Sequence, residues 1–165
     1  MNIDIEIDKK TLSDVLKKFE FAQFAASKYF AEAMNESLMF TEANILLRTP
    51  TGATGNLRAS ISSQLISDMF KNIVGLVHTP KTYAPAVEKG SKPHFPPIEA
   101  LTGKLESLDQ WARLKGISAF AVAKGIAKKG TKKKEMFKKG LDASRQSVFA
   151  IFTAKAQQYL QSLRG

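Results

Sequence analysis

The sequence predicts an α+β fold in which a small antiparallel sheet, built on a central hairpin, packs against two long helices. Three observations predict it. Residues 57–65 and 72–78 have the patterns of two strands joined by a short segment. Residues 12–48 and 141–163 carry apolar side chains at about every third or fourth position, the period of an amphipathic helix. Residues 93–139 contain further helical patterns beside proline-rich and lysine-rich stretches, which predict a helical insertion within a single domain of residues 1–165.

The N-terminal segment alternates between isoleucines and acids, namely Ile3, Ile5 and Ile7 with Asp4, Glu6 and Asp8. This period predicts a short strand with one buried face, at an edge of the hairpin's sheet. Thr11, followed by Asp14 three residues later, predicts the start of a helix that runs to about Arg48. A helix of that length spans about 50 Å, more than a small sheet requires. We therefore expect either a break near Asn35 or a part that protrudes toward neighbouring molecules.

A tight corner precedes the first predicted strand. Pro50, Gly52 and Gly55 end the long helix and permit backbone angles that other residues avoid. Arg58 follows, one residue inside the strand predicted over residues 57–65.

The second predicted strand ends at Pro80, and residues 83–90 are expected to form a short turn that Gly90 closes. Arg58 and Glu88 then lie at the same end of the hairpin. One interpretation is an exposed ion pair, worth about 0–1 kcal/mol. The alternative is a contact between subunits, or one that fixes the corner.

The two segments that flank the hairpin, T-P-T-G-A-T-G-N-L-R and Y-A-P-A-V-E-K-G, resemble the tail-completion or head-tail joining family of tailed bacteriophages, small proteins of the neck between portal and tail. The matching residues are Pro50, Thr54, Gly55, Leu57, Arg58, Ser60, Ile61, Tyr83, Ala84, Val87, Glu88 and Gly90. Residues 126–132 resemble the I-x-x-x-G-T-x stretch of the longer members, which precedes an aromatic residue, here Phe137, and a C-terminal helix. The resemblance covers about residues 15–140, and departs from the family at residues 132–134, where a proline-containing segment is expected.

The resemblance implies a structural virion protein that joins or completes the head-tail connection as a ring subunit, with a hexamer favoured, and not an enzyme. It implies adjoining neck, connector or tail-terminator proteins as partners, assembly in the host cytoplasm and a final place in the neck of the virion. The residues expected at the subunit interface are Pro50, Gly55, Leu57, Arg58, Tyr83 and Glu88. Replacing Arg58 or Glu88 by alanine is then expected to reduce assembly and leave the monomer folded.

Composition narrows the function classes. The chain has 165 residues, 44% of them hydrophobic, which suits one core, and no cysteine, which excludes disulfides and thiolate metal sites. No apolar stretch approaches the roughly 18 residues of a membrane span, and the acidic N-terminus does not resemble a signal peptide. His78 and His94 have no acid at ligand spacing, and neither a nucleophile pattern nor a phosphate-binding loop occurs. We therefore expect no catalytic residue, metal, cofactor or membrane partner.

The positive charge is concentrated in the C-terminal third. Residues 1–100 carry 11 Lys or Arg and 11 Asp or Glu, whereas residues 101–165 carry 14 and 4, which accounts for the net charge of +10. The lysines expected to contact DNA or an acidic partner are Lys128, Lys129, Lys132, Lys133 and Lys134. Lysine alone attracts phosphates without reading bases, so the alternative function is sequence-independent DNA binding through this third. A solvated loop is the other interpretation. In a phage neck the DNA passes through an axial channel, and a channel that held the DNA tightly would impede the exit of the DNA. A protein-facing or solvated role of the lysines is therefore favoured over DNA contact.

The remaining elements follow from proline and apolar spacing. Residues 91–97 are expected to form a proline-rich linker, followed by a helix over residues 98–114 in which Trp111 is a core anchor. Gly116 separates it from a second short helix over residues 117–128. The last helix is expected to pack beside the first on one face of the sheet.

Overall fold

The computed structural model describes residues 9–52, 55–68, 72–96, 112–113 and 115–164. The helices in this part of the chain are α1 (Lys9–Arg48), α2 (Asn56–Ala59), α3 (Ala84–Lys89), α6 (Ala119–Lys129) and α7 (Met136–Ser162), and the strands are β1 (Ser62–Asp68) and β2 (Asn72–His78). The two strands form one antiparallel sheet, so the predicted α+β fold class is confirmed. The predicted strand over residues 2–8 and most of the predicted helix over residues 98–114, including Trp111, lie outside the described residues.

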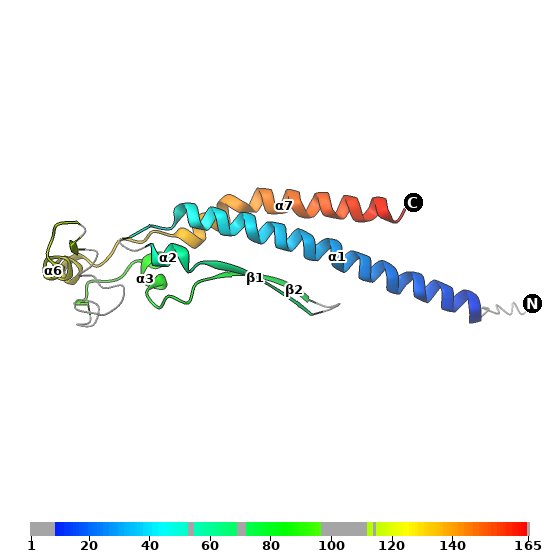
Figure 1. Ribbon diagram of the computed structural model, residues 1–165, viewed down its shortest axis with the longest axis horizontal. Coiled ribbons are helices and arrows are strands. Elements are labelled where there is room, and N and C mark those ends of the chain that lie inside the picture. The colour runs from blue at the N-terminus through cyan, green and yellow to red at the C-terminus, as the bar shows by residue number, and fades with distance from the viewer. Residues whose placement is uncertain (1–8, 53–54, 69–71, 97–111, 114, 165) are drawn as a thin grey trace, which may run out of the picture.

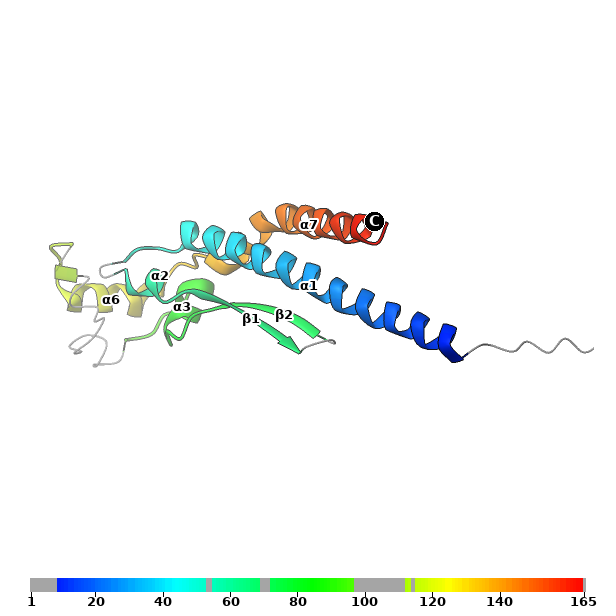
Figure 2. The same cartoon turned by 45° about the vertical axis from the view of Figure 1, so that its right-hand side comes forward.

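The long helix α1 lies in the middle of an elongated molecule, with the hairpin on one side and α7 on the other (Figures 1 and 2). The sequence suggested both long helices on one face of the sheet, whereas α7 packs chiefly on α1. Two strands about 4.8 Å apart make a sheet little wider than one helix of about 10 Å diameter, so the hairpin has room for α1 alone.

Helix α1 runs over 40 residues without the break considered near Asn35. It already includes Lys9, so it begins before Thr11, where the sequence predicted its start. The hydroxyl of Tyr159, near the end of α7, donates to the carbonyl of Ala22 at 3.0 Å. Residues 9–21 of α1 therefore extend past the end of α7, as Figures 1 and 2 show, and we call them the N-terminal arm.

One face of the hairpin packs on α1. The strands pair from Ser62 opposite His78 to Asp68 opposite Asn72, and the predicted second strand is confirmed residue for residue. Gly75 faces the helix so closely that an added Cβ would lie 2.8 Å from both the Leu38 Cδ2 and the Met34 Sδ atoms. A glycine inside a strand is thereby explained, because it lets the helix approach the sheet.

The first predicted strand was placed too early. Residues Asn56–Ala59 form the single turn α2, and β1 starts only at Ser62. Leu57 and Ile61 are buried while Ala59 is exposed, which is the spacing of a helical turn and not of a strand. Arg58 therefore lies in α2 and not in the sheet.

The other boundaries differ more modestly. The turn predicted over residues 83–90 contains the short helix α3, and Gly90 follows it with a φ of 74°. The helix predicted over residues 117–128 is confirmed as α6, one or two residues later along the chain. The last helix starts at Met136, several residues before the predicted start.

Helices α1 and α7 run antiparallel and meet through small and aromatic side chains. Gly140 of α7 lies against Ile45 near the C-terminal end of α1, where an added Cβ would lie 2.8 Å from the Ile45 Cα. Further along, the rings of Phe30 and Phe152 are 6.5 Å apart. The Lys155 ammonium pairs with the Glu32 carboxylate at 3.2 Å. The helices are thus closest where α7 begins.

A buried hydroxyl on α1 leads to a first prediction. The Oγ of Ser37 has no hydrogen-bond partner in the described part of the chain, although the residue is only 3% exposed. An unsatisfied buried polar group costs about 1–3 kcal/mol, and alanine is also the better helix former. Ser37→Ala is therefore expected to raise the free energy of unfolding by about 1 kcal/mol, measured by urea denaturation.

The matched control is Ser144→Ala on α7. Ser144 is fully buried, but its hydroxyl already donates to the Gly140 carbonyl at 2.9 Å. This substitution is expected to give no such gain. Equal stabilisation by both substitutions would show that helix propensity alone explains the effect at Ser37.

Candidate functional site

The two segments that flank the hairpin meet in one buried cluster at the start of α7. Leu57 of α2, Ala84 of α3 and Met136 of α7 are buried against one another, and Val87 and Phe137 pack on them. We call this cluster, with α2, α3 and the first turn of α7, the corner. Residues distant in the sequence thus form one structural unit around the end of the hairpin.

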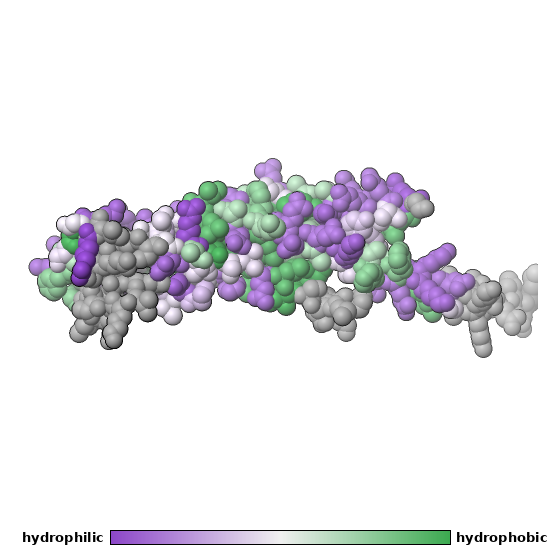
Figure 3. Space-filling model, viewed as in Figure 1, coloured by the Kyte–Doolittle hydropathy of each residue, from purple (hydrophilic) through white to green (hydrophobic). Residues whose placement is uncertain are grey.

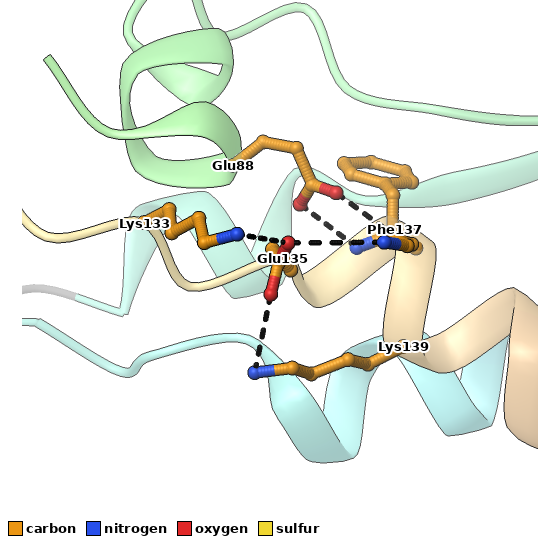
Figure 4. Close-up of polar contacts among 6 residues, drawn as sticks. Glu88, Lys133, Glu135, Phe137 and Lys139 are labelled. Atoms are coloured by element: carbon orange, nitrogen blue, oxygen red, sulfur yellow. Dashed lines mark hydrogen bonds and ion pairs between the residues drawn. The ribbon is translucent and has the colours of Figure 1, made fainter.

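Glu88 joins the two sides of the corner. Its carboxylate accepts hydrogen bonds from the backbone N–H groups of Phe137 and Lys138, both at 3.0 Å, at the N-terminus of α7 (Figure 4). Residue 135, at the N-cap position, makes no side-chain cap of its own. The first turn of a helix has free N–H groups and a partial positive charge, so a carboxylate there is stabilising. Glu88 therefore caps a helix that starts far along the chain, where Phe137 lies 49 residues after it.

A second carboxylate nearby, that of Glu135, forms ion pairs with lysines. The side chain of Glu135 lies 2.8 Å from the Lys133 ammonium and 3.7 Å from that of Lys139 (Figure 4). The hydrogen bond from Lys133 lowers the pKa of Glu135, and the same bond raises the pKa of Lys133. Because the pKa of Glu135 is lower in the folded chain, this stabilisation is present above the ordinary glutamate pKa and is lost as the pH falls through the folded value.

Arg58 and Glu88 lie at the same end of the hairpin, as expected, but they do not pair. Arg58 is exposed on α2 and forms no ion pair with any described residue. Glu88 instead bonds to α7 within its own chain. The simple surface ion pair is therefore not present, and the two side chains have different surroundings.

The other residues predicted at the subunit interface also differ in exposure. Leu57 is only 5% exposed and belongs to the corner's core, whereas Tyr83, just before α3, is 38% exposed. Pro50 and Gly55 are half-buried, and Gly55 has a φ of 70° that favours glycine. Of the six residues, Arg58 and Tyr83 are the exposed side chains at the corner.

The segments that lead into and out of the α6 region pair with each other. Ser91 and Thr131 form an antiparallel bridge in which each backbone N–H donates to the other's carbonyl, and their hydroxyls are 2.9 Å apart. Gly90 and Gly130 flank this bridge with positive φ angles, and a Cβ on either would meet the opposite strand. The bridge holds together the two points at which residues 92–130 leave and rejoin the rest of the chain, and we call residues 92–130 the distal module.

The lysines that were predicted to contact DNA or an acidic partner lie beside this bridge. Lys128 and Lys129 end α6, and Lys132, Lys133 and Lys134 lie in the extended segment before α7. All five are exposed, and only Lys133 forms an ion pair with a described residue. The backbone N–H of Lys134 donates to the Val87 carbonyl at 2.9 Å. The segment is therefore held by hydrogen bonds of its backbone, while its lysine side chains are exposed.

The described contacts at the corner are packing, hydrogen bonds and ion pairs within the chain. His78 and His94 do not belong to any group of three or more metal-binding side chains among the described residues. None of the helices in the described ranges is long and apolar enough to cross a membrane. Comparison with known proteins found no family model, no curated protein and no solved structure that matches the chain.

The capping role of Glu88 was missed by sequence reasoning. One signal was available: no Ser, Thr, Asp or Asn stands just before Met136, where a helix of this length ordinarily has a capping residue. That absence indicates that the cap comes from elsewhere in the fold. It does not indicate which acid supplies it.

Proposed function

We propose that the protein is a structural subunit of the neck of a tailed bacteriophage, where it joins or completes the head-tail connection as a member of a ring, with a hexamer favoured. The proposal assigns it no enzymatic activity. The neck assignment depends on the motif residues that flank the hairpin. Self-association depends on one observation, the apolar surface that the isolated chain leaves uncovered.

Large apolar side chains are exposed on three separate elements (Figure 3). On and beside the N-terminal arm of α1 they are Leu16, Phe19, Phe21 and Phe24; on the outer face of the hairpin, Ile66, Val74 and Leu76; and on α7 and just after it, Leu141, Phe149, Leu160 and Leu163. Their exposures run from 44% to 75%. Exposed apolar surface of this extent marks sites of association.

The total surface supports the same proposal. The accessible surface of the chain is 12412 Å² for a mass of 18.2 kDa. A compact monomer of that mass exposes about 8,100 Å². A chain with so much surface buries more of it when several copies associate, as the proposed ring requires.

A second candidate function is sequence-independent DNA binding through the basic C-terminal third. The observation that favours it is the exposure of four lysines that have no ion-pair partner among the described residues: Lys128, Lys129, Lys132 and Lys134. If they bind phosphates, replacing one of them by alanine would flatten the slope of log affinity against log salt by about 0.9 for duplex DNA. We favour a protein-facing or solvated role for these lysines, because tight binding of DNA in the neck would hinder its exit.

The solution mass of the purified protein tests the proposal. We expect an oligomer larger than a dimer, visible as a ring by electron microscopy, and no strong affinity for duplex DNA. Arg58→Ala is expected to weaken assembly by roughly tenfold, since arginines at subunit boundaries often contribute about 1–2 kcal/mol or more. Its unfolding free energy should be unchanged, because Arg58 is exposed and forms no ion pair with the described residues.

The control is Lys89→Ala, which removes another exposed cation at the corner, on α3, and is expected to leave assembly unchanged. A monomer or dimer that binds DNA with a steep salt dependence would contradict the neck proposal and favour the second function. If Arg58→Ala unfolds the isolated chain, the interface role of that residue is lost. The position of Lys132, Lys133 and Lys134 in an assembled particle separates the roles of the lysines: side chains facing the axis indicate DNA contact.

A further inference from the structure

The distal module presents an exposed surface that is both apolar and cationic. The rings of Phe95 and Phe120 lie 6.3 Å apart, and they are 52% and 64% exposed. Ile117, before α6, is also exposed, and Lys124 and Lys128 follow Phe120 at steps of four residues along the helix. We call these five residues the distal face. Side chains four residues apart lie on one side of a helix, so the apolar and charged groups share a surface.

The charge of this surface is of one sign. The described residues of the module, 92–96, 112–113 and 115–130, contain six Lys or Arg and no Asp or Glu. Among them, Lys92, Lys115, Lys124, Lys128 and Lys129 form no ion pair with a described residue. A partner that fits the distal face therefore has acids beside apolar side chains. Duplex DNA supplies the charge but offers nothing to bury Phe95, Phe120 and Ile117.

One segment of this same chain has that composition. Residues 2–8 alternate three isoleucines with three acids and contain no basic residue. In an extended chain the isoleucines share one side and the acids the other. An extended segment laid along the distal face can thus bury isoleucine against the phenylalanines while its acids lie near the lysines.

The geometry of the chain excludes this contact within one molecule. The segment precedes α1, and the distal module lies at the opposite end of the molecule (Figures 1 and 2). The 40 residues of α1 span about 60 Å, whereas eight fully extended residues reach at most about 29 Å.

We infer that residues 2–8 of one copy bind the distal face of the next copy. The contact joins opposite ends of two identical chains, so it is a head-to-tail contact that closes into a ring when the rotation between copies permits. It gives the self-association proposed above a specific contact, and it rests on that proposal.

Cysteine cross-linking tests the contact directly, because the chain has no cysteine of its own. The double variant Ile5→Cys with Ala121→Cys places one thiol in the segment and one on the exposed side of α6, beside Phe120. Mild oxidation of the full-length protein is expected to give a ladder of covalent oligomers that reducing agent removes. The matched control, Ile5→Cys with Phe149→Cys, places the second thiol on α7 at a residue that is 75% exposed. The control is expected to give far less of the ladder.

Charge reversal distinguishes failure of this contact from failure of self-association itself. A variant with Asp4→Lys, Glu6→Lys and Asp8→Lys, and another with Lys124→Glu, Lys128→Glu and Lys129→Glu, are each expected to associate at least about tenfold more weakly at low salt. An equal mixture of the two variants is expected to recover association, because each then offers the charge that the other lacks.

A wild-type protein that stays monomeric at every concentration would contradict the proposed function, and this contact with it. A wild-type oligomer that tolerates both reversals, or that cross-links equally in the control, would overturn the contact alone. So would a lysine-reversed variant that keeps its oligomeric state and loses only affinity for duplex DNA, since the distal face would then bind nucleic acid.

Discussion

Gly140→Ala is expected to destabilise the protein by about 2 kcal/mol, although alanine is the better helix former. The added Cβ would lie 2.8 Å from the Ile45 Cα and 2.9 Å from the Ile45 backbone nitrogen. These atoms belong to the backbone of α1, so no side-chain rotation relieves the overlap, and the two long helices have to separate. Because the helices approach each other so closely at the start of α7, the destabilisation extends to the packing that follows. Denaturant unfolding at a fixed protein concentration measures it.

Gly125→Ala in α6 is the matched control. Gly125 also lies inside a helix, but an added Cβ there would meet no atom within 4 Å. Only the propensity difference remains, and it favours alanine by up to about 1 kcal/mol. The two substitutions are thus expected to act in opposite directions. A stabilising effect of Gly140→Ala would show that α1 and α7 lie farther apart in solution than the contact between Gly140 and Ile45 indicates.

Glu88→Ala is expected to lower the free energy of unfolding by about 2–3 kcal/mol, because it removes the carboxylate that accepts hydrogen bonds from the N–H groups of Phe137 and Lys138. Hydrogen bonds to a charged group contribute about 1.5–3 kcal/mol, and the helix dipole adds to them. Faster amide exchange at residues 137 and 138, measured by NMR, is expected to accompany the destabilisation and to locate it at the start of α7.

Two further variants define what Glu88 contributes. Glu88→Gln keeps an oxygen acceptor and removes the charge, so its effect is expected to be about half as large. Lys89→Ala, at the neighbouring exposed residue, is expected to change stability by less than about 0.5 kcal/mol. If Glu88→Ala leaves the monomer fully stable and weakens assembly instead, the carboxylate acts between subunits, as the sequence suggested.

The long elements of the fold were predictable because each carries its signal locally. The apolar period of α1 and α7 repeats over many turns, and β2 is a run of β-branched residues next to a proline that ends it. Their ends were less predictable. The residues before Met136 lack a capping signal because the cap comes from Glu88, and α7 was therefore expected to begin later than it does.

The corner is where prediction from the sequence was incomplete. Leu57, Ala59 and Ile61 are spaced as the apolar residues of a strand are. The packing of Leu57 against Ala84 and Met136, which the sequence does not reveal, favours the helical turn instead. That packing joins three segments that lie far apart in the chain. A resemblance to a known family marked the residues that meet there, and the sequence left open whether Glu88 lies between subunits or fixes the corner. Both hydrogen bonds of its carboxylate lie within the chain and join the two sides of the corner.

If the chain forms the proposed ring, the N-terminal arm of α1 affects how reversibly its subunits associate. It is the first three to four turns of α1, roughly, with Leu16, Phe19 and Phe21 exposed on it, and an end of a helix that lacks packing frays because most helical stability in proteins comes from tertiary contacts. Neighbours that cover the arm therefore supply part of the free energy that keeps it helical. The entropy cost of ordering it weakens each contact relative to its area. In the proposed ring, contacts of this kind would release a wrongly placed subunit more readily than rigid ones do, so errors would be corrected while the ring is still growing.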